Sequence, residues 1–144
     1  MKYKKIIIIL SIIIVALGIV KIIFLYAIKS QNQNILYNDK IILYNFSANQ
    51  KIESPLVIKG KARGTWFFEG DFPIILTDWD GLIIAQSYAT AKSDWMTKDY
   101  VEFEGKIGFE KPGLYNRGSL ILQKDNPSGL PEYDDALEIS IEYK

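Results

Sequence analysis

Residues 100–109 read YVEFEGKIGF, and this stretch decides the fold class. Apolar side chains occupy positions 101, 103, 107 and 109, whereas positions 100, 102, 104 and 106 hold Tyr, Glu, Glu and Lys. Because successive side chains of a strand point to opposite faces, this alternation predicts a half-buried antiparallel strand. Residues 136–143, ALEISIEY, repeat the pattern with apolar residues at 137, 139, 141 and 143. The domain is therefore predicted to be built from strands.

Five further β-type runs are present, four before residue 100 and one between the two strands just described. They are Ile41–Phe46, Leu56–Ala62, Phe72–Trp79, Leu82–Ala91 and Ser119–Lys124. Asp80-Gly81 predicts a tight hairpin between two of the runs, since both residues tolerate a positive φ. Seven short strands without a helical period predict an all-β fold, a β-sandwich of about seven antiparallel strands.

The N-terminal region has a different character. Residues 6–28 read IIIILSIIIVALGIVKIIFLYAI, with one charge at Lys21. A helix of this length extends roughly 33 Å, and a bilayer core is about 30 Å thick. We therefore expect a transmembrane α-helix whose partner is the lipid bilayer. Lys2, Lys4 and Lys5 precede the run, so the positive-inside rule places the N-terminus in the cytoplasm and the C-terminal domain outside the cell membrane.

The expected organisation has four parts. Residues 1–5 form a cytoplasmic tail, 6–28 the transmembrane helix, 29–40 a linker and 41–144 the sandwich domain. A cleaved signal peptide is the alternative to an anchor, because Ala16-Leu17-Gly18 resembles a small-x-small cleavage site. Cleavage there would leave IVKIIFLYAI as an apolar N-terminus, which favours an uncleaved anchor.

The formal net charge of zero is the sum of two unlike regions. Residues 1–29 carry five Lys and no acid, whereas residues 30–144 carry 12 bases and 17 acids, a net charge of −5. An acidic domain lacks the positive surface that nucleic-acid binding needs, so no nucleic-acid partner is expected.

The composition also narrows the possible chemistry. The chain has no Cys and no His, which excludes disulfides, thiolate nucleophiles, imidazole bases and Cys- or His-based zinc sites. Paired carboxylates could serve glycoside hydrolysis, but nothing in their spacing selects a pair. We predict no catalytic residues, no enzyme activity and no cofactor.

Acidic residues near the predicted hairpin are weak candidates for a metal site. Asp78 and Asp80, with Asp94 and Asp99 further on, offer oxygen ligands of the kind that Ca²⁺ prefers. The sequence DWDG lacks the later ligands of an EF-hand loop, and a hairpin requires Asp-Gly in any case. We therefore expect a turn and no metal.

Three tryptophans are candidates for ligand binding. Trp66, Trp79 and Trp95 could stack on sugars or contact a protein partner if they are exposed. A β-sandwich also needs large inward residues, so some of these aromatics must belong to the core. We expect Trp95, which lies between two strands, to be the most exposed.

Several short motifs, taken in order, resemble one known family. They are Ser54-Pro55-Leu56, Gly60, Ala62-Arg63-Gly64, Phe68-Glu69, Phe72-Pro73, Asp78-Trp79-Asp80-Gly81, Asp94-Trp95-Met96, Phe103, Gly118-Ser119-Leu120 and the stretch KDNPSG at 124–129. Together they resemble the immunoglobulin-like domain of bacterial spore germination over roughly Ile41 to Tyr143. The resemblance implies an Ig-like β-sandwich of bacterial envelope proteins and supplies no catalytic residues.

These observations lead to a functional prediction. We expect a membrane-anchored module of the bacterial envelope that serves in adhesion, scaffolding or interaction without catalysis. Its partner would be an envelope protein or a cell-wall glycan. The alternative is a glycan- or metal-binding module that uses the exposed aromatics or the acidic loops. No second folded domain is expected beside the module, so we expect a surface module and not a spore protein.

Overall fold

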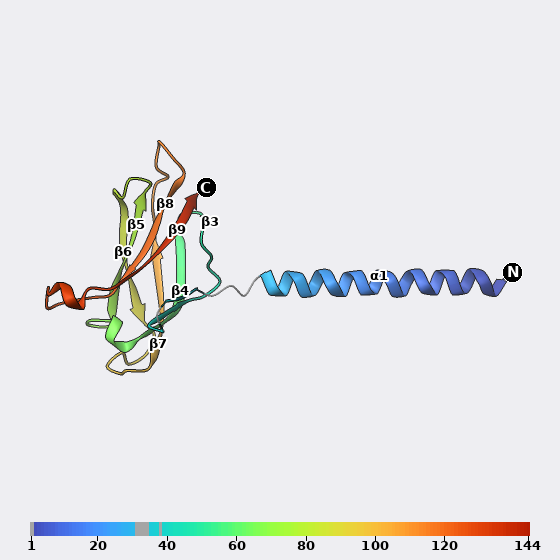
Figure 1. Ribbon diagram of the computed structural model, residues 1–144, viewed down its shortest axis with the longest axis horizontal. Helices are drawn as coiled ribbons and strands as arrows, with labels where there is room; N and C mark the ends of the chain where they lie inside the picture. The colour runs from blue at the N-terminus through green and yellow to red at the C-terminus, as the bar shows by residue number, and fades with distance from the viewer. Residues whose placement is uncertain (1, 31–34, 38) are drawn as a thin grey trace. The chain divides into compact units, whose positions relative to one another are not determined.

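The computed structural model describes the backbone of residues 2–30, 35–37 and 39–144, and the side chains of residues 3, 4, 6, 12–25 and 39–144. The chain divides into two compact units, residues 1–33 and 34–144 (Figure 1). The first unit contains α1, a single helix over Lys2–Ser30. The second unit contains all the strands, and each unit is described by itself.

Helix α1 includes the predicted helical run, but the prediction that it spans a membrane is wrong. Among the described residues, none of the helices combines the length and the apolar character that crossing a bilayer requires. The predicted position of the C-terminal domain outside the cytoplasm is not tested by the structure and stays a prediction.

Within the described part of the second unit, nine strands form one sheet. The strands are β1 Ile35–Tyr37, β2 Ile41–Leu43, β3 Gln50–Ile52, β4 Leu56–Arg63, β5 Asp71–Asp78, β6 Ile83–Ala91, β7 Tyr100–Ile107, β8 Arg117–Gln123 and β9 Ala136–Tyr143. Their order across the sheet is β1-β2-β4-β7-β6-β5-β8-β9-β3, and the pairs are antiparallel except for the parallel pair β3–β9. Two short 3-10 turns, η1 Gly64–Trp66 and η2 Pro131–Tyr133, lie between strands.

The predicted fold class, an Ig-like sandwich of about seven antiparallel strands, is therefore wrong. A sandwich has two separate sheets, whereas the described strands form one sheet. One sheet results because residues 89–91 of β6 pair with β7 and join the two halves. Gly105 allows this close approach, since a Cβ there would lie 3.1 Å from the carbonyl oxygen of Tyr88 and 3.2 Å from the Cα of Ala89. The sheet curls into a half-barrel, and its two halves face each other (Figure 1).

All seven predicted strands are present, with ends that differ by a few residues. The two additional strands, β1 and β3, have three residues each, and β1 lies inside the predicted linker 29–40. Residues 31–34 and 38 of that linker lie outside the described residues. The predicted central position of Phe72–Trp79 is confirmed, because β5 lies between β6 and β8.

The core fills the concave side of the curled sheet, and the alternation that predicted the strands matches it. Positions 101, 103 and 107 of β7 and positions 137, 139, 141 and 143 of β9 are buried, and Phe109 is half-buried. Phe72 lies at the centre of an aromatic cluster. Its ring contacts Trp66, Phe67 and Phe103 edge-on, with centroid distances of 6.4, 5.2 and 4.9 Å.

A buried hydrogen bond connects β9 to β5 across β8. The Tyr143 hydroxyl donates to the carbonyl oxygen of Thr77 at 2.7 Å. Gly118 lies between these two strands and leaves room for the contact, because a Cβ there would lie 1.9 Å from the Thr77 oxygen and 2.8 Å from the Tyr143 ring. Burial, and next the charge of Asp78, raise the pKa of Tyr143 to about 12.

We predict that Phe72→Ala strongly destabilises the domain. Phe72 is fully buried, and removing a buried Phe side chain costs roughly 3–5 kcal/mol through lost burial and the cavity that remains. Urea unfolding followed by circular dichroism measures the change in the free energy of unfolding. Phe68→Ala is the matched control, because Phe68 is 40% exposed and its loss should cost much less. Equal effects of the two substitutions would contradict the assigned core.

We also predict a specific loss of stability at alkaline pH. The unfolded chain releases the Tyr143 proton near pH 10, whereas the folded chain holds it to about pH 12. This contribution to stability is therefore complete below pH 10 and disappears as the pH rises toward 12. Tyr143→Phe should remove that part of the pH dependence and cost about 1 kcal/mol at neutral pH through the lost hydrogen bond. Urea unfolding at pH 8 and pH 11 measures both effects, with Tyr88→Phe, at an exposed site, as the control.

Candidate functional site

A polar groove of about 420 Å³ lies where β5 ends and β8 begins. We call it the Trp79 groove. Its lining residues come from β5, the turn that follows it, β8, β9 and the loop before β3. They are Asn49, Asp78, Trp79, Arg117, Gly118, Ser119, Ser140 and Ile141. The groove thus combines one large aromatic ring with hydroxyl, amide and charged side chains.

Strand register places the hydroxyl groups of the groove in a row. Ser119 of β8 is paired with Thr77 of β5 on one side and with Ser140 of β9 on the other. Directly paired residues of adjacent strands point to the same face, so the two serines lie side by side on the outer face of the sheet. Asn49 joins this row from the neighbouring loop, because its backbone N–H donates to the carbonyl oxygen of Ser140 at 2.7 Å.

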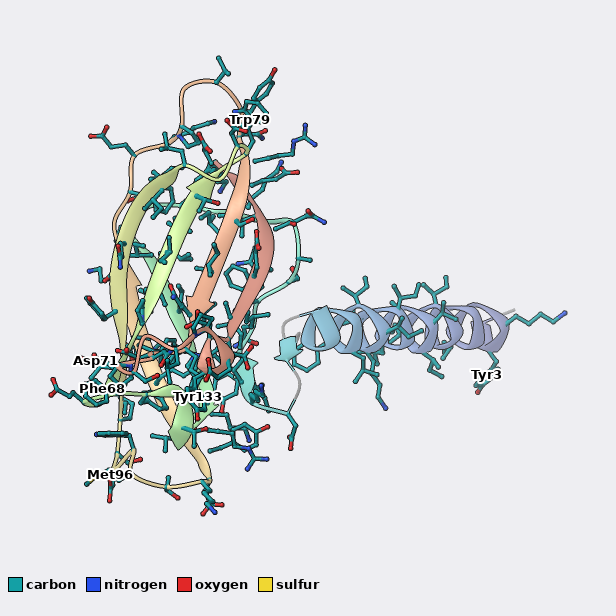
Figure 2. The ribbon with its side chains drawn as sticks, turned by 60° about the vertical axis from the view of Figure 1, so that its left-hand side comes forward. Tyr3, Phe68, Asp71, Trp79, Met96 and Tyr133 are labelled. Carbon is teal, nitrogen blue, oxygen red and sulfur yellow. The ribbon has the colours of Figure 1, made fainter. Side chains whose placement is uncertain are left out.

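Trp79 projects from the hairpin turn that follows β5, and its side chain is 52% exposed. Asp78 fixes this turn, since its Oδ1 accepts hydrogen bonds from the backbone N–H groups of Asp80 and Leu82, each at 2.9 Å. The Trp79 ring packs edge-on against Tyr115, with centroids 5.1 Å apart. Figure 2 shows Trp79 at one end of the strand unit, with its ring beyond the strands. The turn therefore presents an aromatic surface whose backbone is held in place.

Arg117 supplies the positive charge of the groove. It is exposed at the start of β8, and within the described part of the chain its guanidinium makes no hydrogen bond or ion pair. Glu142 is its partner in the strand register, but the Glu142 carboxylate lies 4.0 Å from the Lys51 ammonium. Arg117 thus remains available to a ligand.

The other predicted tryptophans lie elsewhere. Trp66 is 1% exposed and belongs to the core. Trp95 is half-buried and packs against the core, so the expectation that it is the most exposed tryptophan is wrong. It lines a second cavity of about 390 Å³ together with Phe67 and Met96. Trp79 and Met96 mark opposite ends of the strand unit (Figure 2), so the structure does not bring the three tryptophans together.

Two of the predicted acidic candidates, Asp78 and Asp94, accept hydrogen bonds that hold turns. Asp78 Oδ1 is occupied by the hairpin backbone, and Asp94 Oδ1 accepts from the Met96 N–H at 2.9 Å. The other two candidates, Asp80 and Asp99, are exposed. In the loop before β9, two further acidic residues have partners: Asp134 accepts from Asn126 at 2.8 Å, and Asp135 forms an ion pair with Lys40. Across the residues whose placement is described, no three acidic side chains form a group that could hold a metal ion.

Four residues of the groove escaped sequence reasoning. Asn49, Arg117, Ser119 and Ser140 are ordinary polar residues, spread over more than 90 positions of the chain. The strand pairing that brings these residues together is not visible locally in the sequence.

Comparison with known proteins gives one match. The sequence profile of the family described as the immunoglobulin-like domain of bacterial spore germination matches residues 47–129, a shorter range than the predicted resemblance. The matched range includes Asp78, Trp79 and Arg117 of the groove, whereas Ser140 lies beyond it. No curated protein and no solved structure matches the chain. Because the profile covers more than half of the sequence, the chain belongs to the family of the immunoglobulin-like domain of bacterial spore germination.

Proposed function

We propose that the strand unit is a non-catalytic interaction module of the bacterial envelope that binds glycan in the Trp79 groove. The observation that carries this proposal is the exposed Trp79 ring beside the row formed by Ser119, Ser140 and Asn49. Sugars have an apolar face that packs on aromatic rings and hydroxyl groups that exchange hydrogen bonds with hydroxyl and amide side chains. Binding of this kind would support an adhesion or scaffolding role.

The carboxylate content of the groove supports binding without catalysis. Glycoside hydrolysis requires two carboxyl groups on either side of the scissile bond. Among the described residues that line the Trp79 groove, Asp78 is the one carboxylate, and its Oδ1 accepts two backbone hydrogen bonds. The groove therefore offers contacts for a glycan and lacks the paired acids of a hydrolase.

The rigidity of the site favours recognition. Most lining residues lie on paired strands, and the Trp79 turn is fixed by Asp78 and by the left-handed conformation of Gly81, with φ of 83°. A site that is already formed loses little conformational entropy when a ligand binds. This agrees with a module whose task is to hold a ligand.

We predict that cell-wall polysaccharide changes the fluorescence of Trp79. The full-length protein is titrated with purified polysaccharide, and emission is recorded for the wild type and for Trp79→Phe. The wild type should show a saturable change, because Trp79 is the exposed emitter while Trp66 is buried. Trp79→Phe should lose the change and keep the emission of the other tryptophans.

Affinity measurements complete this test. Trp79→Ala should lower the affinity at least tenfold, since removing a central aromatic anchor typically costs roughly 2 kcal/mol or more. Phe68→Ala, which removes an exposed ring at the other end of the domain, should leave the affinity unchanged. A flat titration of the wild type, or an equal loss in both variants, would contradict the proposed site.

A further inference from the structure

We propose that the Trp79 groove selects glycans whose sugars carry a carboxylate, and that Arg117 binds this carboxylate. The inference rests on the proposed function, because it names the ligand class of the same site.

The chain has two arginines, Arg63 and Arg117, and their side chains differ in their contacts. Arg63 is fully engaged: it donates to the Asp39 carboxylate at 2.8 Å and to the Asp39 backbone oxygen at 3.1 Å, and its guanidinium lies 4.0 Å from the centroid of the Tyr100 ring. The Tyr100 hydroxyl donates a hydrogen bond to Asp39 Oδ1 at 2.7 Å, and this bond, followed by the hydrogen bond and the charge of Arg63, lowers the pKa of Asp39. Arg63 thus has two partners in this fold, a carboxylate that accepts its hydrogen bond and an aromatic ring beneath its guanidinium.

Arg117 lies near an aromatic ring of the same groove but has no carboxylate partner among the described residues. Trp79 shares the groove with it, while Asp78 directs Oδ1 to the backbone of the hairpin turn. The guanidinium presents several N–H donors in a planar fork that matches the two oxygens of a carboxylate. A ligand carboxylate would therefore complete for Arg117 the arrangement that Asp39 completes for Arg63.

The remaining lining residues identify the rest of the ligand. Arg117 and Ser119 are two positions apart on β8 and so point to the same face of the sheet, where Ser140 lies beside Ser119. These hydroxyl groups can bond the hydroxyl groups of a sugar, and Trp79 can pack against its ring. A carboxylate-bearing sugar satisfies all of these groups together, whereas a neutral sugar leaves Arg117 without a partner.

The test uses two probes that have the same sugar rings and differ only at the carboxyl group, which is ionised in one and methyl-esterified in the other. The first probe is a xylotetraose that carries one glucuronic acid residue, and the second is the methyl ester of the same oligosaccharide. They have the same rings, but only the first carries a carboxylate. Isothermal titration calorimetry of the full-length protein should show tighter binding of the acid form. Arg117→Gln should lower the affinity for the acid about tenfold or more, because a charge-assisted hydrogen bond is lost. The affinity for the methyl ester should not change. Arg117→Lys should keep the charge but lose the paired geometry. Its affinity for the acid should therefore lie between those of the wild type and Arg117→Gln.

The controls separate a local contact from general electrostatics. Lys98→Gln removes one positive charge from the opposite cavity, which Lys98 lines with Met96, and should leave both affinities unchanged. Urea unfolding should show that Arg117→Gln is as stable as the wild type, since the exposed side chain contacts no partner in the described fold.

The possible failures are distinguishable. Equal binding of the two probes by the wild type, or an acid preference that survives in Arg117→Gln, would overturn the carboxylate inference and leave the glycan site in place. Binding of neither probe would also overturn it, while the polysaccharide titration of Trp79 decides on the proposed function independently. A preference lost equally in Lys98→Gln would show that the preference reflects net charge and does not arise at Arg117.

Discussion

The contact between the Phe72 and Phe103 rings, which lies over β6, is the constraint on which the remainder of the strand unit depends. The two rings come from β5 and β7, which lie on either side of β6, and their centroids are 4.9 Å apart. The residues of β6 that are paired with them are small: Phe72 is paired with Ala89, which is fully buried, and Phe103 is paired with Ala91. Alanines on the middle strand therefore leave room for the two rings to pack against each other at the density of a protein interior.

The strands could be predicted from the sequence, but their assembly into one sheet could not. Alternation along 100–107 and 136–143 reports which side chains face the core, and every strand with this signal is present. The pairing that joins the halves involves only residues 89–91 of β6, and their backbone contacts leave no periodic trace in the sequence. Strands β1 and β3, with three residues each, are too short to show alternation.

The site was predictable only in part, because it too depends on contacts between strands that lie far apart in the sequence. The DWDG motif predicts a hairpin, and a residue at a hairpin tip is exposed, so Trp79 could have been ranked above the other tryptophans. Trp66 and Trp95 differ from it only in tertiary surroundings: η1 places Trp66 in the core, and Trp95 lies over the core beside Phe67. The polar half of the groove depends on the register between β8 and β9. Local sequence does not encode that register.

The overall charge of the domain further restricts the ligand. Residues 30–144 have a net charge of −5, so a densely charged polyanion would be repelled by most of the surface while it met one cation at Arg117. Such repulsion is long-ranged at low salt and weakens over about 10 Å at 0.1 M salt, whereas the contact with Arg117 acts at hydrogen-bond distance. A ligand with isolated carboxylates, separated by neutral sugar surface, gains the contact with Arg117 and suffers little repulsion. We therefore expect the acidic surface to disfavour strongly charged polymers and Arg117 to favour ligands with sparse, well-placed charge.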